Sequence, residues 1–358
     1  MNKKINNNIL RAGTAKSDIT TNEPGVLIKD PMYAKALVID DGQTRFVYIA
    51  MDVTAIGGRK ISAGMLPDVS EDFLPNLRAK IENELHIPGC NILVNASHTH
   101  PPGRMLCDDQ EQVNRTFDAV KRAASGMVPV RIGSGSGHED SLTINRTVKL
   151  KNGKDWTFRH TNPSPPEQEI AGYRDIDPEI GLLKIERLDG SPLAVIYNFA
   201  CHPLFGDLQG AITANYPGVA SGVIETKLDK GMIALFMQGA GGNIIDRGFK
   251  DFSKDRDITP MGAKLGQSSL DAVEKISGEK VALKVINEVI ELPRRTDIPE
   301  RIEELRREQT ELLASLHGTT LNFEEFYSIY PQYIAKSDVN ESGMDKTRRG
   351  HVAKYLRS

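Results

Sequence analysis

The sequence predicts an α/β protein in which mixed β-sheets are flanked by helices. Short runs of β-branched and other apolar residues recur along the chain, as strands require. Amphipathic stretches of helical period follow several of these runs, and breakers with glycine or proline separate the two. The chain has 358 residues, of which 39% are hydrophobic, so it can bury a large core. Strands that alternate with helices in this way build sheets covered by helices.

The first part of the chain predicts a hairpin, a helix and a third strand. Within residues 33–52, two β-rich runs flank Asp41-Gly42, a dipeptide favoured in tight hairpin turns. The second run is almost wholly apolar, so it is expected to be buried. Apolar residues recur every three or four positions over residues 71–86 and predict a helix. After a Pro-Gly breaker, residues 91–95 predict a short buried strand.

The alternation continues further along the chain. Helices are predicted over residues 111–124 and 261–277, and another follows Tyr216-Pro217-Gly218 and runs through about residue 228. Apolar strands are predicted over residues 193–199 and 232–237. Residues 140–190 differ, because they are polar and predict short strands with a proline-containing surface loop.

We expect one main domain over residues 10–290, followed over residues 291–358 by a helical extension or by an incomplete remainder of that domain. A stretch rich in Glu, Arg and Leu over residues 297–316 predicts an exposed helix. Its inner face would carry Ile302, Leu305, Leu312, Leu313 and Leu316. Residues 337–358 have few apolar side chains and are expected to fray.

Composition narrows the classes of function. The formal net charge is −3 and aromatic residues make up 6% of the chain, so no nucleic-acid partner is expected. Three cysteines, Cys90, Cys107 and Cys201, indicate reduced thiols rather than a disulfide framework. The N-terminus lacks the apolar core of a signal peptide, and no run has the length of a transmembrane segment. A cytoplasmic location is therefore expected, with secretion after leader removal and the oligomeric state left open.

Three predicted strands are followed by residues that carry chemistry. These segments are 95–103, 198–203 and 238–243. Ligands of open α/β sheets bind beyond the carboxyl ends of strands. His98 and His100 would face one side of an extended strand end, and His202 follows a second strand. Imidazole is a common metal ligand, and a catalytic zinc usually has three protein ligands and one open position. On spacing alone, loop histidines without a metal are an equal alternative.

The segments around these histidines resemble those of the neutral/alkaline ceramidases. The run SHTHPPG at residues 97–103 is similar to their Thr/Ser-His-Thr-His-Ser-x-Pro-Gly segment. The run NFACHP at residues 198–203 is similar to their second histidine motif. Further segments that resemble the family follow in the same order, at residues 15–20, 144–146, 177–183, 216–218 and 236–242. The resemblance covers residues 10–290 and implies the N-terminal catalytic domain of that family.

The resemblance implies a role for several residues. His98 and His202 match the two family histidines that bind zinc. His100 matches a nearby histidine that supports these ligands or contacts the substrate, and Arg146 falls in an Asn-Arg element expected near the substrate. The implied reaction is hydrolysis of an amide or related acyl bond, in which water activated by zinc attacks the carbonyl. The implied partner is a small-molecule or lipid-like acyl substrate.

The sequence departs from the family in two places. The family completes its zinc site with a Glu and a Tyr from a later segment, and no segment here matches it. The tail instead offers Glu324, Glu325, Tyr327, Tyr330 and Tyr333 in a different context. The family's Gly-Asp-Val-Ser is replaced by GNII at residues 242–245, so Ile245 stands in place of the serine. We therefore expect a substrate other than ceramide.

Two residues of that replaced segment, Gly242 and Asn243, are candidate catalytic residues. The backbone amides of Gly241 and Gly242 would stabilise a developing oxyanion beside the metal, or the glycines form a plain turn. Asn243 stands where the family has Asp, so one negative charge near the site is absent. An inactive or truncated relative that binds metal or a partner without turnover is the alternative function. A nucleotide-binding protein is a third.

Four further features have two interpretations each. Glycines within residues 133–137 predict a strand connection rather than a phosphate loop, because the Gly-Lys-Ser/Thr ending of such a loop is absent. Cys201 is expected to pack in the core with a raised pKa rather than act as a nucleophile. Asp52 and Asp18 are each expected to orient a histidine or to cap a loop.

Overall fold

The protein is described by a computed structural model that forms two compact units, Met1–Val285 and Ile286–Ser358. The described residues are 9–56, 69–100, 109–157, 165, 167–204, 211–228, 231–248 and 257–315. Within these ranges, no helix has the length and apolar character needed to cross a membrane.

An eight-stranded mixed sheet is the centre of the first unit, with the order β12-β11-β10-β5-β1-β2-β3-β4. Its strands are β1 (Arg11–Asp18), β2 (Tyr33–Asp40), β3 (Arg45–Met51), β4 (Ile92–Ala96), β5 (Val128–His138), β10 (Glu179–Arg187), β11 (Pro192–Phe199) and β12 (Ile233–Gln238). The outermost pairs, β3 with β4 and β11 with β12, are parallel. The other neighbouring strands are antiparallel.

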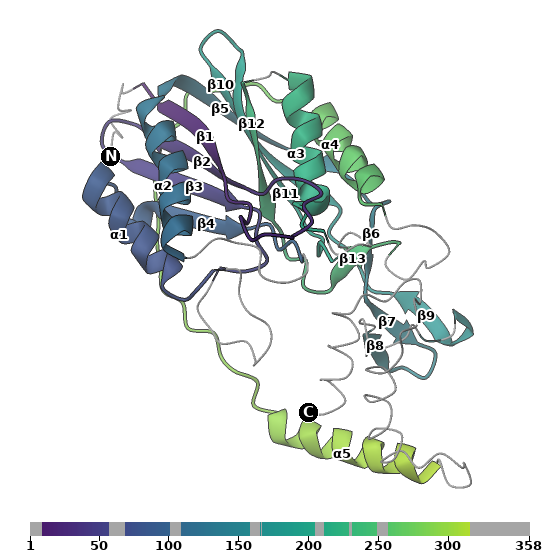
Figure 1. Ribbon diagram of the computed structural model, residues 1–358. Helices are drawn as coiled ribbons and strands as arrows, with labels where there is room; N and C mark the ends of the chain where they lie inside the picture. Colours follow the sequence, from purple (N-terminus) through teal and green to yellow (C-terminus); the bar gives the residue numbers. More distant parts are fainter. Residues whose placement is uncertain are drawn as a thin grey trace, which may run out of the picture. The chain divides into compact units, whose positions relative to one another are not determined.

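Four helices cover the sheet, as the sequence predicts. They are α1 (Phe73–Leu85), α2 (Asp109–Ser125), α3 (Asn215–Leu228) and α4 (Thr259–Val273). Helices α1 and α2 lie beside β1–β4, whereas α3 and α4 lie beside β10–β12 (Figure 1). Short 3-10 helices occupy Gly89–Asn91 and Glu167–Glu169.

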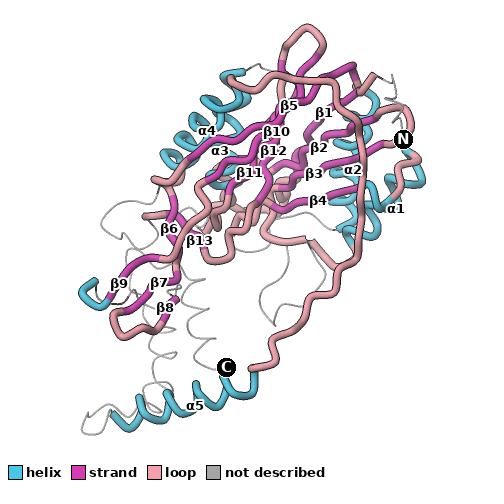
Figure 2. Tube along the Cα trace, turned by 180° about the vertical axis from the view of Figure 1, so that it is seen from behind, coloured by secondary structure: helices cyan, strands magenta, loops and turns pink. Residues whose placement is uncertain are grey.

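The sheet is doubled over at β5, so its two halves pack face to face. Strand β5 pairs with β1 only through Val128 and Pro129 and with β10 over the rest of its length. Apolar side chains of β2 and β3, such as Leu37, share one core cluster with Leu235 of β12. The hydroxyl of Tyr48 donates across this interface to the Phe236 carbonyl at 2.9 Å. The result is four layers, helix, sheet, sheet and helix (Figure 2).

The predicted hairpin of residues 33–52 is confirmed as β2 and β3, with Leu37 opposite Tyr48. Gly42 takes a φ of 84°, a conformation that glycine adopts without steric cost. Strand β3 is buried on both faces, because α1 and α2 pack on one face and the second half of the sheet on the other. This explains why its sequence is almost wholly apolar.

Two sequence predictions about strands are wrong. Residues 133–137 lie inside β5 and not in a connection. A Cβ at Gly133 would lie 2.4 Å from the Ser277 carbonyl oxygen, and one at Gly135 would lie 2.9 Å from Ile276. Glycine at alternate positions therefore lets the segment after α4 approach the sheet closely. Strand β4 was predicted to be buried, but it is an edge strand in which Leu93 is 45% exposed.

Residues 140–190 contain short strands, as predicted, in addition to the long β10. Strand β6 (Thr143–Asn145) pairs with β13 (Ile244–Asp246), and β7 (Thr147–Leu150) pairs with β8 (Asp155–Thr157) and β9 (Ile170–Tyr173). The pairing of β6 with β13 brings Ile245, which is fully buried, next to Ile144.

The second unit contains helix α5 (Ile298–Ser315), close to the predicted bounds. Its predicted inner face is not buried, since Ile302 and Leu305 are 44% and 58% exposed. The other three residues of that face, and the predicted frayed tail at residues 337–358, lie outside the described side chains.

Candidate metal centre

Two of the candidate histidines lie in the loop that follows β4. The loop is fixed to the neighbouring strand end, because the amide of Ser97 donates to the Met51 carbonyl and that of His98 to the Val53 carbonyl, at 2.8 and 2.9 Å. The sequence predicted an extended backbone here, but His98 has a φ of 65°, in the left-handed region. The side chains of His98 and His100 converge through this turn and not through strand alternation.

The third histidine, His202, lies three residues beyond β11, in the other half of the sheet. Its amide donates to the Ile244 carbonyl at 2.9 Å, which joins this loop to β13. The amide of His100 donates to the Pro203 carbonyl at 3.1 Å, which joins the two histidine loops directly. The face-to-face packing of the two halves therefore brings distant strand ends to one place.

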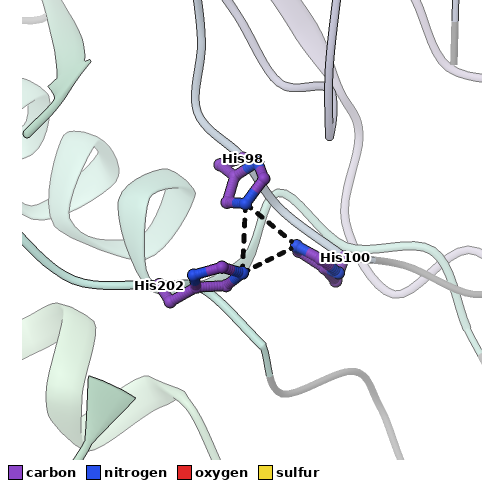
Figure 3. Close-up of side chains that lie close together, drawn as sticks. All are labelled: His98, His100 and His202. Carbon is purple, nitrogen blue, oxygen red and sulfur yellow. Dashed lines mark hydrogen bonds between the residues drawn. The ribbon is translucent and has the colours of Figure 1, made fainter. Parts of the chain in front are cut away.

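The three imidazoles form a triangle of Nε2 atoms (Figure 3). The separations are 3.0 Å between His98 and His202, 3.2 Å between His98 and His100, and 3.1 Å between His100 and His202. All three side chains are half-buried. Nitrogen lone pairs at this distance repel one another unless a proton or a cation lies between them.

Backbone carbonyls fix the orientation of two of the rings. The Nδ1 atom of His98 lies 2.7 Å from the Thr54 carbonyl oxygen, and that of His202 lies 3.3 Å from the Gly241 carbonyl oxygen. A carbonyl only accepts hydrogen bonds, so both Nδ1 atoms act as donors, and in the neutral imidazole the Nε2 atom then presents a lone pair to the centre. Metal-binding histidines are oriented in this way.

The triangle has the size that a zinc ion requires. Zinc–nitrogen bonds of about 2.0–2.1 Å at tetrahedral angles place ligand nitrogens about 3.3–3.4 Å apart. The observed separations of 3.0–3.2 Å are close to that value. Three imidazoles also leave a fourth position free for water or substrate, as in a catalytic zinc site. The donor set therefore fits zinc.

The other candidate residues, Arg146, Gly242 and Asn243, contact one another. The amide of Arg146 donates to the Asn243 carbonyl at 2.8 Å, and its guanidinium donates to the Gly242 carbonyl. This segment adjoins Gly241, whose carbonyl accepts from His202. The amide of Gly241 donates to the Gly239 carbonyl at 2.7 Å, so it is not available to an oxyanion. Of the two predicted glycine donors, only the amide of Gly242 stays a candidate.

The structure also decides between the two interpretations given for Cys201, Asp52 and Asp18. Cys201 is fully buried, and burial raises the pKa of its thiol well above the usual value, which agrees with a packing role. The carboxylate of Asp52 accepts from the Tyr33 amide at 2.9 Å, and that of Asp18 accepts from the Thr20 amide at 2.8 Å. Both carboxylates therefore cap backbone amides.

Sequence reasoning missed the partners that hold the histidines. Thr54, whose carbonyl accepts from His98, lies after β3. In that segment the sequence singles out only Asp52 as a candidate. Thr99 separates the two nearby histidines, yet threonine at such a position is too common to predict a role. The tail residues 324–333 lie outside the described part of the chain.

Solved structures of other proteins have a similar fold. No protein-family model matches the sequence. The chain is similar to a neutral ceramidase from Pseudomonas aeruginosa, with a TM-score of 0.53 and 20% identity over 75% of this chain and 45% of that chain. It is also similar to a ceramidase complexed with C2, with a TM-score of 0.55 and 20% identity over 75% of this chain and 44% of that one. The chain thus has a neutral-ceramidase-like fold and spans less than half the length of these ceramidases.

Proposed function

We propose, from a neutral-ceramidase-like fold with three convergent histidines, that this chain provides the metal-binding part of a zinc-dependent hydrolase. The bond cleaved is an amide or a related acyl bond in a small or lipid-like substrate. A shared fold does not by itself determine chemistry, so the triangle of Nε2 atoms, with sides of 3.0–3.2 Å, carries the proposal. Ile245 is buried and has no hydroxyl, which favours a substrate other than ceramide.

Each residue of the site has a defined task in this proposal. A zinc ion held here would polarise the acyl carbonyl and lower the pKa of a coordinated water to about 7. His98 and His202 would hold the ion through Nε2, because their Nδ1 atoms donate to backbone carbonyls. Arg146 orients the 242–243 segment through its two hydrogen bonds, and the amide of Gly242 donates to the developing oxyanion.

His100 has two roles that the proposal keeps distinct. Its Nε2 lies where a third ligand would, 3.2 Å from that of His98 and 3.1 Å from that of His202. Its match to a family histidine that supports the ligands or contacts the substrate argues instead for binding or polarising the substrate. Metal content separates the roles: His100→Ala loses zinc affinity if the residue is a ligand, and keeps zinc but loses turnover if it contacts the substrate.

The first test is zinc content, measured by plasma mass spectrometry on protein prepared in metal-free buffer and then supplied with zinc. We expect about one zinc per chain in the wild type and loss of zinc in the His98→Ala/His202→Ala double variant. His138→Ala is the matched control, because this histidine is 66% exposed and lies outside the triangle. Absence of zinc from the wild type after zinc is supplied would refute the proposed metalloenzyme.

A second candidate function is metal binding without turnover. The observation that favours it is the ligand group itself, which among the described residues contains three histidines and no carboxylate. Zinc-loaded protein should then be tested against a panel of N-acyl p-nitroanilides and acyl esters. Turnover that disappears in the double variant supports the hydrolase, and stoichiometric zinc with no turnover supports the binding protein.

A further inference from the structure

Thr99, the residue between the two nearby histidines, is held through its side-chain hydroxyl and its backbone carbonyl. Its side chain is fully buried, and its hydroxyl donates to the Thr213 carbonyl at 2.9 Å. Its own carbonyl accepts from the hydroxyl of Thr54 at 2.6 Å. The carbonyl of Thr54 also accepts from His98, so one threonine contacts two consecutive residues of the loop.

The left-handed backbone at His98 explains why such fixing is needed. A residue with a side chain disfavours a φ of 65°, so the surrounding contacts must hold this conformation in place. If the peptide after His98 rotated away, the imidazoles of His98 and His100 would no longer point at a common centre. The hydrogen bonds of Thr99 oppose that rotation from two directions.

The acceptor of the Thr99 hydroxyl is itself fixed. The hydroxyl of Thr213 donates to one oxygen of Asp30 at 2.6 Å and accepts from the Asn215 amide at 2.9 Å. The other oxygen of Asp30 accepts from the Ala214 amide, also at 2.6 Å. This anchor lies at the start of α3, which packs on the half of the sheet that carries His202.

We propose that Thr99 is a positioning residue of the metal site, and that its hydroxyl bond to Thr213 aligns the imidazoles of His98 and His100. The inference rests on the proposed function, because it assumes that the aligned imidazoles bind zinc. It assigns to Thr99 no contact with metal or substrate. Partners of metal-binding histidines set affinity in this way, and their loss typically weakens binding by about 10–100-fold.

The test replaces the hydroxyl at constant volume. Thr99→Val removes the donor, Thr99→Ser keeps it, and Thr116→Val is the control, since Thr116 is equally buried in α2 and its hydroxyl has no partner among the described residues. Zinc affinity is measured by competition with a chromophoric chelator, and the absorption spectrum of the cobalt-substituted protein reports ligand geometry. We expect Thr99→Val to bind zinc about 10-fold or more weakly with an altered cobalt spectrum. Thr99→Ser and Thr116→Val should match the wild type.

Wild-type zinc affinity and cobalt spectrum in Thr99→Val would overturn the proposal. Should that variant fail to fold, Thr54→Val with Thr54→Ser tests the same peptide from its other side, with the same expectations. A measurement on metal-free protein separates this inference from the proposed function. Nitrogen–proton correlation spectra of the imidazoles should show a proton fixed on Nδ1 of His98 in the wild type but not in Thr99→Val. That result supports positioning even if the wild type binds no zinc, and an unchanged spectrum contradicts it.

Discussion

The Nε2 atoms of His98 and His202 lie 3.0 Å apart, although 104 positions separate the two residues in the sequence. Both rings donate through Nδ1 to backbone carbonyls, so in the neutral imidazoles a lone pair of each ring faces the other. This arrangement is unfavourable in the empty site and favourable around a cation.

Zinc should stabilise the folded protein. A ligand that binds only the folded state adds a stabilisation of about 2.7 kcal/mol when its free concentration is about 100 times Kd. We therefore expect the melting temperature to rise by several degrees on zinc addition, measured by differential scanning calorimetry. The rise should be absent in His202→Ala and retained in His138→Ala. An equal rise in all three proteins would mean that zinc binds elsewhere.

Gly241→Ala should weaken metal binding, whereas the neighbouring Gly242→Ala should not. A Cβ at position 241 would lie 2.6 Å from the side-chain nitrogen Nε2 of Gln238 and 3.0 Å from the Cys201 carbonyl carbon. The Gln238 side chain must move from the Cys201 carbonyl, to which it donates, and the close contact with the Cys201 backbone displaces the Gly241 carbonyl that holds His202. A Cβ at position 242 meets nothing within 4 Å. Zinc titration of both variants checks this, and equal affinities would show that the Gly241 carbonyl does not orient the ring.

Two glycines at α3 and α4 should respond to alanine in opposite directions. Gly262→Ala places a Cβ 2.5 Å from that of Val219 and 2.8 Å from the Tyr216 carbonyl, and we expect a loss of about 1–3 kcal/mol in the free energy of unfolding. Gly222→Ala meets nothing within 4 Å and should stabilise α3 by about 0.5–1 kcal/mol. Urea unfolding measures both. A Gly262→Ala variant as stable as the wild type would show that the two helices separate easily.

Asp52→Asn should change how stability depends on pH. Burial raises the pKa of Asp52 from 3.8 to about 6, so between these values the folded state holds a proton that the unfolded state has released. This carboxyl therefore favours the folded state below pH 3.8, and that advantage is lost as pH rises to about 6. The Asn variant keeps an acceptor for the Tyr33 amide.

Unfolding free energies of the wild type and Asp52→Asn should thus agree near pH 4 and diverge as pH rises. Above pH 6 the variant should be the more stable, by up to about 3 kcal/mol. Urea unfolding at a series of pH values measures the difference. Parallel curves for the two proteins would mean that Asp52 titrates at its ordinary value.

The sequence predicts the helices and strands of this fold better than it predicts how they pack into layers. The Asp41-Gly42 hairpin and the helix at α1 follow from local turn chemistry and periodicity. Local patterns do not predict that Gly133 lies in a strand, because the glycine is explained by the close approach of Ser277, which is distant in the sequence. Local patterns also do not predict the exposure of Leu93, since an apolar run does not reveal whether a strand lies at the edge of a sheet.

For the candidate site too, the sequence predicts the residues but not the packing that brings them together. Residue type, strand ends and family resemblance predict His98, His100 and His202 as site residues, and the structure brings them together. Their convergence depends on the doubling of the sheet at β5, which no local pattern encodes. Thr54 contributes a backbone carbonyl, a group that every residue possesses, so its role leaves no mark in the sequence.

The doubled sheet gives a bound ion a mechanical consequence. Of its proposed ligands, His98 follows a strand of one half and His202 follows a strand of the other, 104 residues further along the chain. Such an ion would cross-link the two halves reversibly. To bind both histidines in the unfolded chain, the ion would have to close a loop of that length, at a cost in conformational entropy. With zinc bound, the two halves should separate in a single cooperative step, and a chelator should remove the tie without breaking a covalent bond.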